Sequence, residues 1–497
     1  MIRLALLTLF IAFLSVYAWR DWFKALCGLI ALMAVVEHPD MPKSLMGIQG
    51  LNPWNILLAI IIAAWAKQRS REGLKWDMPS GTVFLLVLYL LIVIVGFIRL
   101  ASNHAGVDEY VVVRQVDEVT FGGMFSEFII NCVKWVIPGL LLFDGVRDRT
   151  RMKWAIWAIS FIYVGLAIQV IKWMPLNTLT NGADLGSRSL KILVREVGYH
   201  RVNIAVLLAG GAWALFVART MVEKKLQFWL VTFTSFVVAF GLALTGGRAG
   251  YATWAAVGVV LALIRWRKYL VLGPIAVMIL MSFVPAVRER LLNGFTEESR
   301  DSNALLDQPQ VIQSGKADMY TVTAGRNVAW PAVIAKIKKA PLVGHGREAM
   351  QNTGIATMLY VNYGEDFPHP HNAYLQWLLD NGLLGAIPVF LFYLIMTTRS
   401  ISLFRDSRSP LFVTAGGMSL ALIAALLIGA FGSQTFYPRE GAVGMWCAMC
   451  LMMRIYVERA RILETVKESR VVNGPKTWDR WLWPVLTPTS APAAVRK

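Results

Sequence analysis

The chain has 497 residues, of which 56% are hydrophobic and only 16% are charged, and its mean hydropathy is +0.53. A water-soluble domain carries about 25% charged residues, so this composition excludes an ordinary soluble fold. The formal net charge of +18 reflects membrane topology and attraction to anionic lipid, and it does not indicate a nucleic-acid partner.

Apolar stretches of roughly 16 to 24 residues recur along the chain, each long enough to cross a hydrocarbon core about 30 Å thick as a helix. They lie at 2–18, 22–37, 51–66, 80–99, 127–144, 153–175, 199–218, 226–245, 250–264, 269–287, 372–396, 411–432 and 440–457. The first also fits a cleavable signal peptide, but a second apolar stretch follows at once, which favours a retained helix. We predict an all-α, polytopic membrane bundle of about 12 to 13 helices.

Basic residues are concentrated in alternate loops, which predicts that those loops are cytoplasmic because Lys and Arg near helix ends stay on that side. The basic segments are 67–75, 147–153, 224–225, 265–268, 399–408 and the region after 454. The loops at 38–50, 100–126, 176–198, 246–249, 288–371 and 433–439 then face outside. This divides the chain into N-terminal helices at 1–287, a large outside loop at 288–371, C-terminal helices at 372–458 and a cytoplasmic tail at 459–497.

The outside loops hold more basic residues than this tendency predicts, which indicates that something anionic binds there. They are Arg188, Lys191, Arg195, Arg201, Arg248, Arg290 and Arg326. All six histidines, His38, His104, His200, His345, His369 and His371, lie on or beside the same face.

Arg248 lies in the glycine-broken junction 245–250 between two predicted spans. A charged residue near membrane depth costs on the order of 2.5–3.5 kcal/mol and marks a ligand or ion pathway. The glycines around it would let the backbone approach a bulky anion closely. The alternative is an arginine that extends to the interface and helps to end the helix.

Arg201 begins another span, directly after His200. A cation in the first helical turn opposes the helix dipole, which favours anions at that end. Its position is explained if a phosphate is shared between the helix end and the guanidinium, with an interfacial residue as the alternative.

The large outside loop contains an amphipathic helix that begins at Arg326 and stops at Pro341, and we expect it to lie flat on the outer leaflet. The turn that follows is expected to expose its backbone and His345. Two prolines then hold His371 rigidly at the start of the next span.

The last of these segments has a distinctive spacing: His371-Asn372, nine residues, Gly382, two residues and Gly385. This pattern resembles the histidine signature of the bacterial O-antigen ligase and polymerase superfamily. The family is also similar in having a Gly-Arg-x-x-x-Trp helix, here from Gly325, a Pro-Leu-x-Gly-x-Gly turn, here from Pro341, and an arginine motif between spans, here Arg248. We interpret the small residues Gly382 and Gly385 as sites of close helix packing.

The resemblance covers residues 195–400, and within this range the chain differs from the family's pattern at two motifs. Gly247-Arg248 replaces the usual Ser-Arg, and His200-Arg201-Val202-Asn203 replaces an Asp-Arg-x-Asn-like helix start, which puts the role of Arg201 in question.

What the resemblance implies is a glycosyltransferase of the bacterial inner membrane with its active site facing the periplasm. It would move a glycan from undecaprenyl pyrophosphate to an acceptor hydroxyl on lipid A-core or on another glycan or a protein, with inversion and with neither metal nor other cofactor. Its further partners would be membrane lipids.

The residues fit that chemistry, because positioned arginines stabilise the charge that grows on a leaving pyrophosphate without Mg²⁺. His371 would deprotonate or orient the acceptor hydroxyl, with a helix-capping histidine as the alternative. The candidates are Arg248, Arg201 and Arg326 for the pyrophosphate, and Asn372, His345 and His369 for secondary contacts.

Two other functions stay open. A polymerase of the same superfamily would use a lipid-linked repeat as acceptor, although the single dominant outside loop favours a ligase. A transporter or flippase of a lipid-linked glycan would also explain the helices and arginines, but it should show repeated halves and broken helices near the bilayer midplane, and neither is visible in the sequence.

Overall fold

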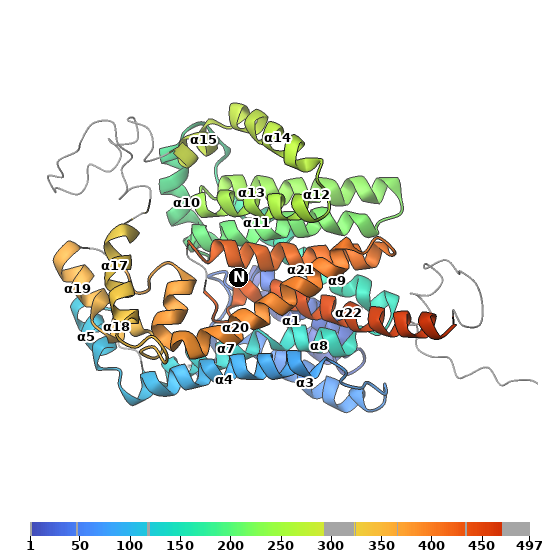
Figure 1. Ribbon diagram of the computed structural model, residues 1–497, viewed down its shortest axis with the longest axis horizontal. Coiled ribbons are helices and arrows are strands. Elements are labelled where there is room, and N and C mark those ends of the chain that lie inside the picture. Colours follow the sequence, from blue (N-terminus) through green and yellow to red (C-terminus); the bar gives the residue numbers. More distant parts are fainter. Residues whose placement is uncertain are drawn as a thin grey trace, which may run out of the picture.

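The computed structural model describes residues 2–45, 48–116, 120–292, 323, 325–364, 366–432 and 435–469. Within these ranges the long helices run side by side and form one bundle (Figure 1). The strands of these ranges are β1 (Ser44–Leu45) and β2 (Ile48–Gln49), an antiparallel pair in a loop. The predicted all-α fold class is confirmed.

The bundle takes helices from the whole chain. Its first half contributes α1 (Ile2–Tyr17), α2 (Trp22–Ala31), α3 (Pro53–Arg69), α4 (Ser80–Ser102), α6 (Phe121–Phe125), the π-helical turn η2 (Ser126–Ile130), α7 (Asn131–Lys134), α8 (Ile137–Gly145), α9 (Arg149–Trp173), α11 (Arg201–Ala218) and α12 (Lys225–Leu244). Its second half contributes α13 (Arg248–Ile264), α14 (Tyr269–Phe283), α20 (Ala373–Arg405), α21 (Pro410–Gly429) and α22 (Val443–Ser469). Single 3₁₀ turns occur at η1 (Leu32–Ala34), η3 (Leu176–Thr180), η4 (Arg219–Met221) and η7 (Glu440–Ala442).

Short helices gather at one end of the bundle, which we call the cap end (Figure 1). They are α5 (Ala105–Arg114), α10 (Gly182–Glu196), α15 (Pro285–Leu292), α17 (Arg326–Ile337), α18 (Ala349–Asn352) and α19 (Ile355–Tyr363). The opposite end, where α22 leaves the bundle, is the tail end. The described parts of the loops predicted to lie outside are at the cap end, and the described parts of the basic loops are at the tail end (Figure 1).

Eight helical stretches in the described part are long and apolar enough to cross a membrane, and three shorter apolar helices lie at 5–17, 22–34 and 248–264. Every apolar stretch predicted from the sequence falls on a helix. Those predicted at 51–66 and 269–287 are α3 and α14, with 17 and 15 residues. The prediction of a multi-pass membrane protein is confirmed.

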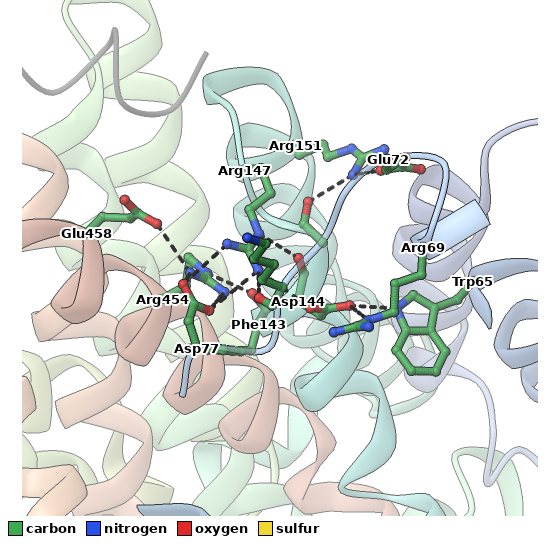
Figure 2. Close-up of polar contacts among 12 residues, drawn as sticks. Trp65, Arg69, Glu72, Asp77, Phe143, Asp144, Arg147, Arg151, Arg454 and Glu458 are labelled. Carbon is green, nitrogen blue, oxygen red and sulfur yellow. Dashed lines mark hydrogen bonds and ion pairs between the residues drawn. The ribbon is translucent and has the colours of Figure 1, made fainter. Parts of the chain in front are cut away.

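At the tail end, charged side chains are buried in pairs of opposite sign (Figure 2). Arg454 is fully buried, and its guanidinium lies 2.6 Å from a carboxylate oxygen of Asp77 and 3.2 Å from one of Glu458. Asp144 is also fully buried and lies 2.9 Å from the Nε of Arg69. Because an unpaired buried charge is strongly destabilising, these pairs fix α22 to the loop between α3 and α4, and α8 to α3, at this end.

Helix α20 is broken at Gly382, whose φ of 61° and ψ of −167° belong to a region that glycine alone adopts readily. The turn 341–346 docks on the break, and a Cβ added to Gly382 would lie 2.4 Å from the carbonyl of Leu342. Four backbone hydrogen bonds join them: His345 to Leu379, Gly346 to Asp380, Leu383 to Pro341 and Leu384 to Leu342, each donor named first. The turn thus satisfies groups that the broken helix leaves unpaired.

Two sequence-based expectations are corrected by this contact. The first three residues of the 341–346 turn are exposed as expected, but backbone groups of Pro341, Leu342, His345 and Gly346 are hydrogen-bonded to α20 and are not free. Gly382 does not serve helix-to-helix packing, because the atoms nearest to its missing Cβ belong to the turn.

The amphipathic helix α17 does not lie flat on the outer leaflet by its apolar face. Ala329 and Val333 on that face are fully buried, in a cluster that includes Leu359, Phe367 and Leu379. The expectation was wrong because the helix finds an apolar partner inside the protein, in α19 and the first half of α20, and no longer needs lipid to cover it.

Candidate functional site

Arg201 and Arg248 are the first residues of α11 and α13, two helices that pack closely at the cap end. A Cβ added to Gly247 or Gly250 would lie 2.7 or 2.4 Å from the Cβ of Ala205 on α11. These glycines therefore face α11 and serve close packing, which brings the two helix starts together. The expectation that they leave room for an anion is replaced by this role.

A third arginine, Arg290 of α15, lies at the same place. Its Nε donates to the carbonyl of Gly246 at 3.3 Å, and Arg201 donates to the carbonyl of Gly186 on α10 at 2.5 Å. A Cβ on Gly186 would lie 2.7 Å from the Arg290 guanidinium, so α10 supports both side chains. Burial lowers the pKa of Arg290, and together with the charges of Arg201 and Arg248 it brings this pKa to about 10.

Arg326, the first residue of α17, reaches this group from the large loop. Its guanidinium donates to the carbonyl of Gly432 after α21, and its Nε is buried without a partner in the described part of the chain. Burial lowers the pKa of Arg326, and the nearby charge of Arg248 lowers it as well. The structure therefore brings together the three arginines predicted from the sequence and adds Arg290.

Arg201, Arg290 and Arg326 each donate to a backbone carbonyl. Within the described ranges, none of Arg201, Arg290 and Arg326 forms an ion pair with a carboxylate. Half-buried like charges destabilise one another, and a multivalent anion bound among them would remove that repulsion. Guanidinium groups also match the oxygens of phosphate geometrically, so the arrangement suits a pyrophosphate.

His371 stands directly before α20, with a left-handed φ of 50° that is uncommon for a residue other than glycine. The N-cap of the helix is Asn372, whose side-chain oxygen accepts from the amides of Tyr374 and Leu375 at 3.0 and 3.2 Å. His371 is therefore not a capping histidine. Its ring lies 4.3 Å from that of His369, centroid to centroid.

Both histidines of this pair are held neutral. Burial lowers the pKa of His371 to about 3, with further contributions from His369 and Arg326. Burial likewise lowers the pKa of His369 to about 4, with Arg439 and Arg347 contributing. The imidazoles are therefore unprotonated at neutral pH and can accept a proton.

His345 does not join the histidine pair. It lies in the turn that docks on α20, and its Nε2 is 3.1 Å from the carbonyl oxygen of Lys336. Of the predicted secondary residues, His369 is thus in contact with His371, Asn372 caps the following helix, and His345 lies elsewhere.

Two further arginines near the histidines were not predicted. Arg347 is buried, with its guanidinium carbon 3.3 Å from the ring centre of Tyr437, and Arg439 lies 3.9 Å from Glu127 of η2. In the sequence Arg347 directly follows the 341–346 turn, but only the fold shows that both arginines lower the pKa of His369. The residues that the structure describes contain no group of three His, Cys, Asp or Glu side chains arranged to hold a metal ion.

Comparison with protein families gives one match for this region. Residues 233–390 match the model of the family described as O-antigen ligase. The matched segment runs from α12 into α20 and includes Arg248, Arg290, Arg326 and His371, while Arg201 lies outside it. No match was found among curated proteins.

Proposed function

We propose that this chain, which belongs to the O-antigen ligase superfamily through residues 233–390, is a membrane glycosyltransferase with a donor glycan linked to undecaprenyl pyrophosphate. The family implies a glycosyltransferase-like enzyme of polysaccharide biosynthesis that uses a lipid-linked glycan and a glycan acceptor. The observation that carries the finer proposal is the group of half-buried arginines, bonded to carbonyls, beside a neutral histidine pair.

In the proposed reaction the acceptor oxygen forms a bond to the anomeric carbon of the donor sugar, on the face opposite the bond that breaks. The bond between this carbon and the pyrophosphate oxygen breaks, and its electron pair stays on undecaprenyl pyrophosphate. Arg201, Arg248, Arg290 and Arg326 stabilise this growing negative charge without a metal ion. The acceptor proton passes to His371, so atoms and charge balance.

The proposal links the basicity of His371 to donor binding. The pKa of this group is about 3, because burial and neighbouring positive charge disfavour the imidazolium. A pyrophosphate among the arginines adds negative charge nearby, which favours the imidazolium and raises the pKa. His371 then becomes a stronger base only when a donor is present to react.

The proposed setting is the bacterial inner membrane with the cap end in the periplasm. The described loops dense in Lys and Arg lie together at the tail end, and Lys and Arg near helix ends are expected to stay in the cytoplasm. Lipid A-core is the proposed acceptor, and the hydroxyl of another glycan or a protein is an alternative to it.

The transporter alternative has one structural feature in its favour, the broken helix α20, since transporters use such breaks to coordinate substrates. Here, however, the 341–346 turn forms hydrogen bonds with the carbonyls of Leu379 and Asp380 and with the amides of Leu383 and Leu384. These four groups are not available to a substrate. The break therefore serves to dock the turn, and it does not favour the transporter alternative.

The decisive experiment is glycan transfer by the purified full-length protein with an undecaprenyl-pyrophosphate-linked oligosaccharide and EDTA, with and without lipid A-core. We expect transfer to the core, reduced by about 10²–10⁴-fold in His371→Ala and unchanged in the control His38→Ala. Chain lengthening without core would make the protein a polymerase. No product from wild type, with donor binding equal in wild type and His371→Ala, would overturn the enzyme proposal in favour of transport.

A further inference from the structure

A cavity of about 550 Å³ opens on the surface of the cap end, and none of the four arginines of the site lines it. It lies between the start of α5, the last turn of α17, and α18. The residues that matter for its chemistry are Asn103, Glu109, Lys336, His345 and Asn352.

The walls of this cavity are held together by specific contacts. Gly106 packs so closely on α18 that an added Cβ would lie 2.3 Å from the carbonyl oxygen of Asn352. The Asn352 amide donates to the carbonyl of Asn103 at 2.8 Å. On the other wall, the ring of His345 meets the Lys336 carbonyl at 3.1 Å. The cavity is therefore a built feature of the cap.

Its polar groups are balanced in charge. Glu109 and Lys336 are of opposite sign, and neither has an ion-pair partner among the residues described. The side chains of Asn103, His345 and Asn352 add both hydrogen-bond donors and acceptors. A phosphate would gain little from such a lining, whereas a neutral molecule rich in hydroxyl groups can donate to the carboxylate and accept from the ammonium.

Helix α18 contacts both the cavity and the histidine loop, which we define as residues 366–371. Gln351 donates to the carbonyl of Pro368 in the histidine loop at 3.4 Å, while the next residue, Asn352, lines the cavity. A helix is about 10 Å across with its side chains. A glycan of several sugars that reaches His371 with one unit can therefore reach the cavity with another.

We infer that this cavity is a second saccharide subsite, which binds sugars several units away from the bond that is transferred. The inference rests on the proposed function. The bound sugars come either from the distal part of the donor glycan or from the core oligosaccharide of the acceptor, two sources with the same chemistry. Binding there would hold a long glycan in register while the arginines and His371 act on its end.

Direct binding to the full-length protein in nanodiscs tests the subsite without catalysis. The two probes are the lipid-free oligosaccharide released from the donor and the delipidated core oligosaccharide, each titrated by saturation-transfer NMR. We expect one of them to bind, and the double variant Glu109→Gln, Lys336→Gln to bind it about tenfold more weakly, the effect of losing a hydrogen bond to a charged group. Lys338→Gln, an exposed lysine one residue past the end of α17, is the matched control and should bind as wild type does.

The identity of the bound probe assigns the source of the sugars. Absence of binding by both probes, or equal binding by the double variant and wild type, overturns the subsite. The circular dichroism and thermal midpoint of the double variant should match wild type, because both substituted side chains lie on the surface of the cavity.

Failure of the subsite is distinguishable from failure of the proposed function. Saccharide binding that persists in His371→Ala while wild type transfers no glycan would overturn the function and keep the subsite. Transfer by wild type with no probe bound, and with KM for both substrates unchanged in the double variant, would overturn only the subsite.

Discussion

Arg454 at the tail end and Arg290 at the cap end are both withdrawn from water, but their surroundings differ. Arg454 is fully buried between Asp77 and Glu458, with a carboxylate 2.6 Å away (Figure 2). Arg290 is half-buried, donates to a backbone carbonyl and lies near other arginines, which lower its pKa. A cation neutralised by carboxylates holds the structure together, whereas one bonded to a carbonyl keeps its charge for a ligand.

We expect Arg454 to contribute free energy to folding, and Arg290 to contribute it to ligand binding and catalysis. Removing one member of a buried ion pair leaves the other charge uncompensated, so the folded state loses stability. Removing one of several half-buried arginines relieves repulsion, so the folded state without ligand should lose little. The cost then appears in binding and catalysis, where the missing charge would have met the pyrophosphate.

The largest effect is expected at the tail end. Arg454→Met removes the fully buried partner of Asp77 and Glu458, which then keep only the more exposed Arg147 and Arg461, and it should cost about 3–5 kcal/mol of stability. Thermal unfolding of the purified protein measures it. The exposed Arg405→Met is the control and should keep the wild-type midpoint; an unchanged midpoint in Arg454→Met would contradict the structural role of the pair.

At the cap end, Arg290→Gln should lower kcat/KM for glycan transfer by about 10²–10³-fold, the loss typical of one group that stabilises transition-state charge. Its thermal midpoint should stay at the wild-type value, because the lost hydrogen bond is to a carbonyl at 3.3 Å. Arg288→Gln, on the same helix but exposed, is the matched control. A lowered thermal midpoint with unchanged glycan transfer would show that Arg290, like Arg454, stabilises the fold and does not act in the reaction.

The break in α20 is expected to affect both stability and catalysis, because the part of the helix before the break begins next to His371 at the cap end. Gly382→Ala forces a residue with a Cβ into glycine-only backbone, about 1–3 kcal/mol of strain, and against the Leu342 carbonyl. We expect a lower midpoint and reduced transfer together. Gly273→Ala is the control, since a Cβ there meets nothing within 4 Å. A fully stable, active Gly382→Ala would show that the docking of the turn is dispensable.

The smallest effect is on pH dependence. Because the pKa of His371 is lowered to about 3 and that of His369 to about 4, the unprotonated forms persist well below the usual histidine range near 6.5. The acid limb of kcat/KM, which reports the free enzyme, should therefore be absent between pH 7 and about 5. Arg326→Gln removes one repelling charge and should move that limb to higher pH. A wild-type midpoint near 6.5 would refute the lowered pKa values.

Hydropathy was sufficient to locate the helices, because a bilayer sets the length of a span and that length is visible in any stretch of sequence. Local motifs were also the basis for proposing Arg248 and His371 as site residues, since glycines beside an arginine and prolines beside a histidine act on their own neighbours. The position of Arg201 at a helix start was predicted for the same reason.

Contacts between distant segments were decided only by the tertiary structure. Arg290 joins the site because α10 supports it through Gly186, more than a hundred residues earlier in the chain. The apolar face of α17 is covered by α19 and α20 and not by lipid, and the 341–346 turn completes a helix broken at Gly382. Span length and local turn chemistry belong to single segments, whereas the partner of a buried face, a guanidinium or a broken helix is another segment, and folding alone brings the two together.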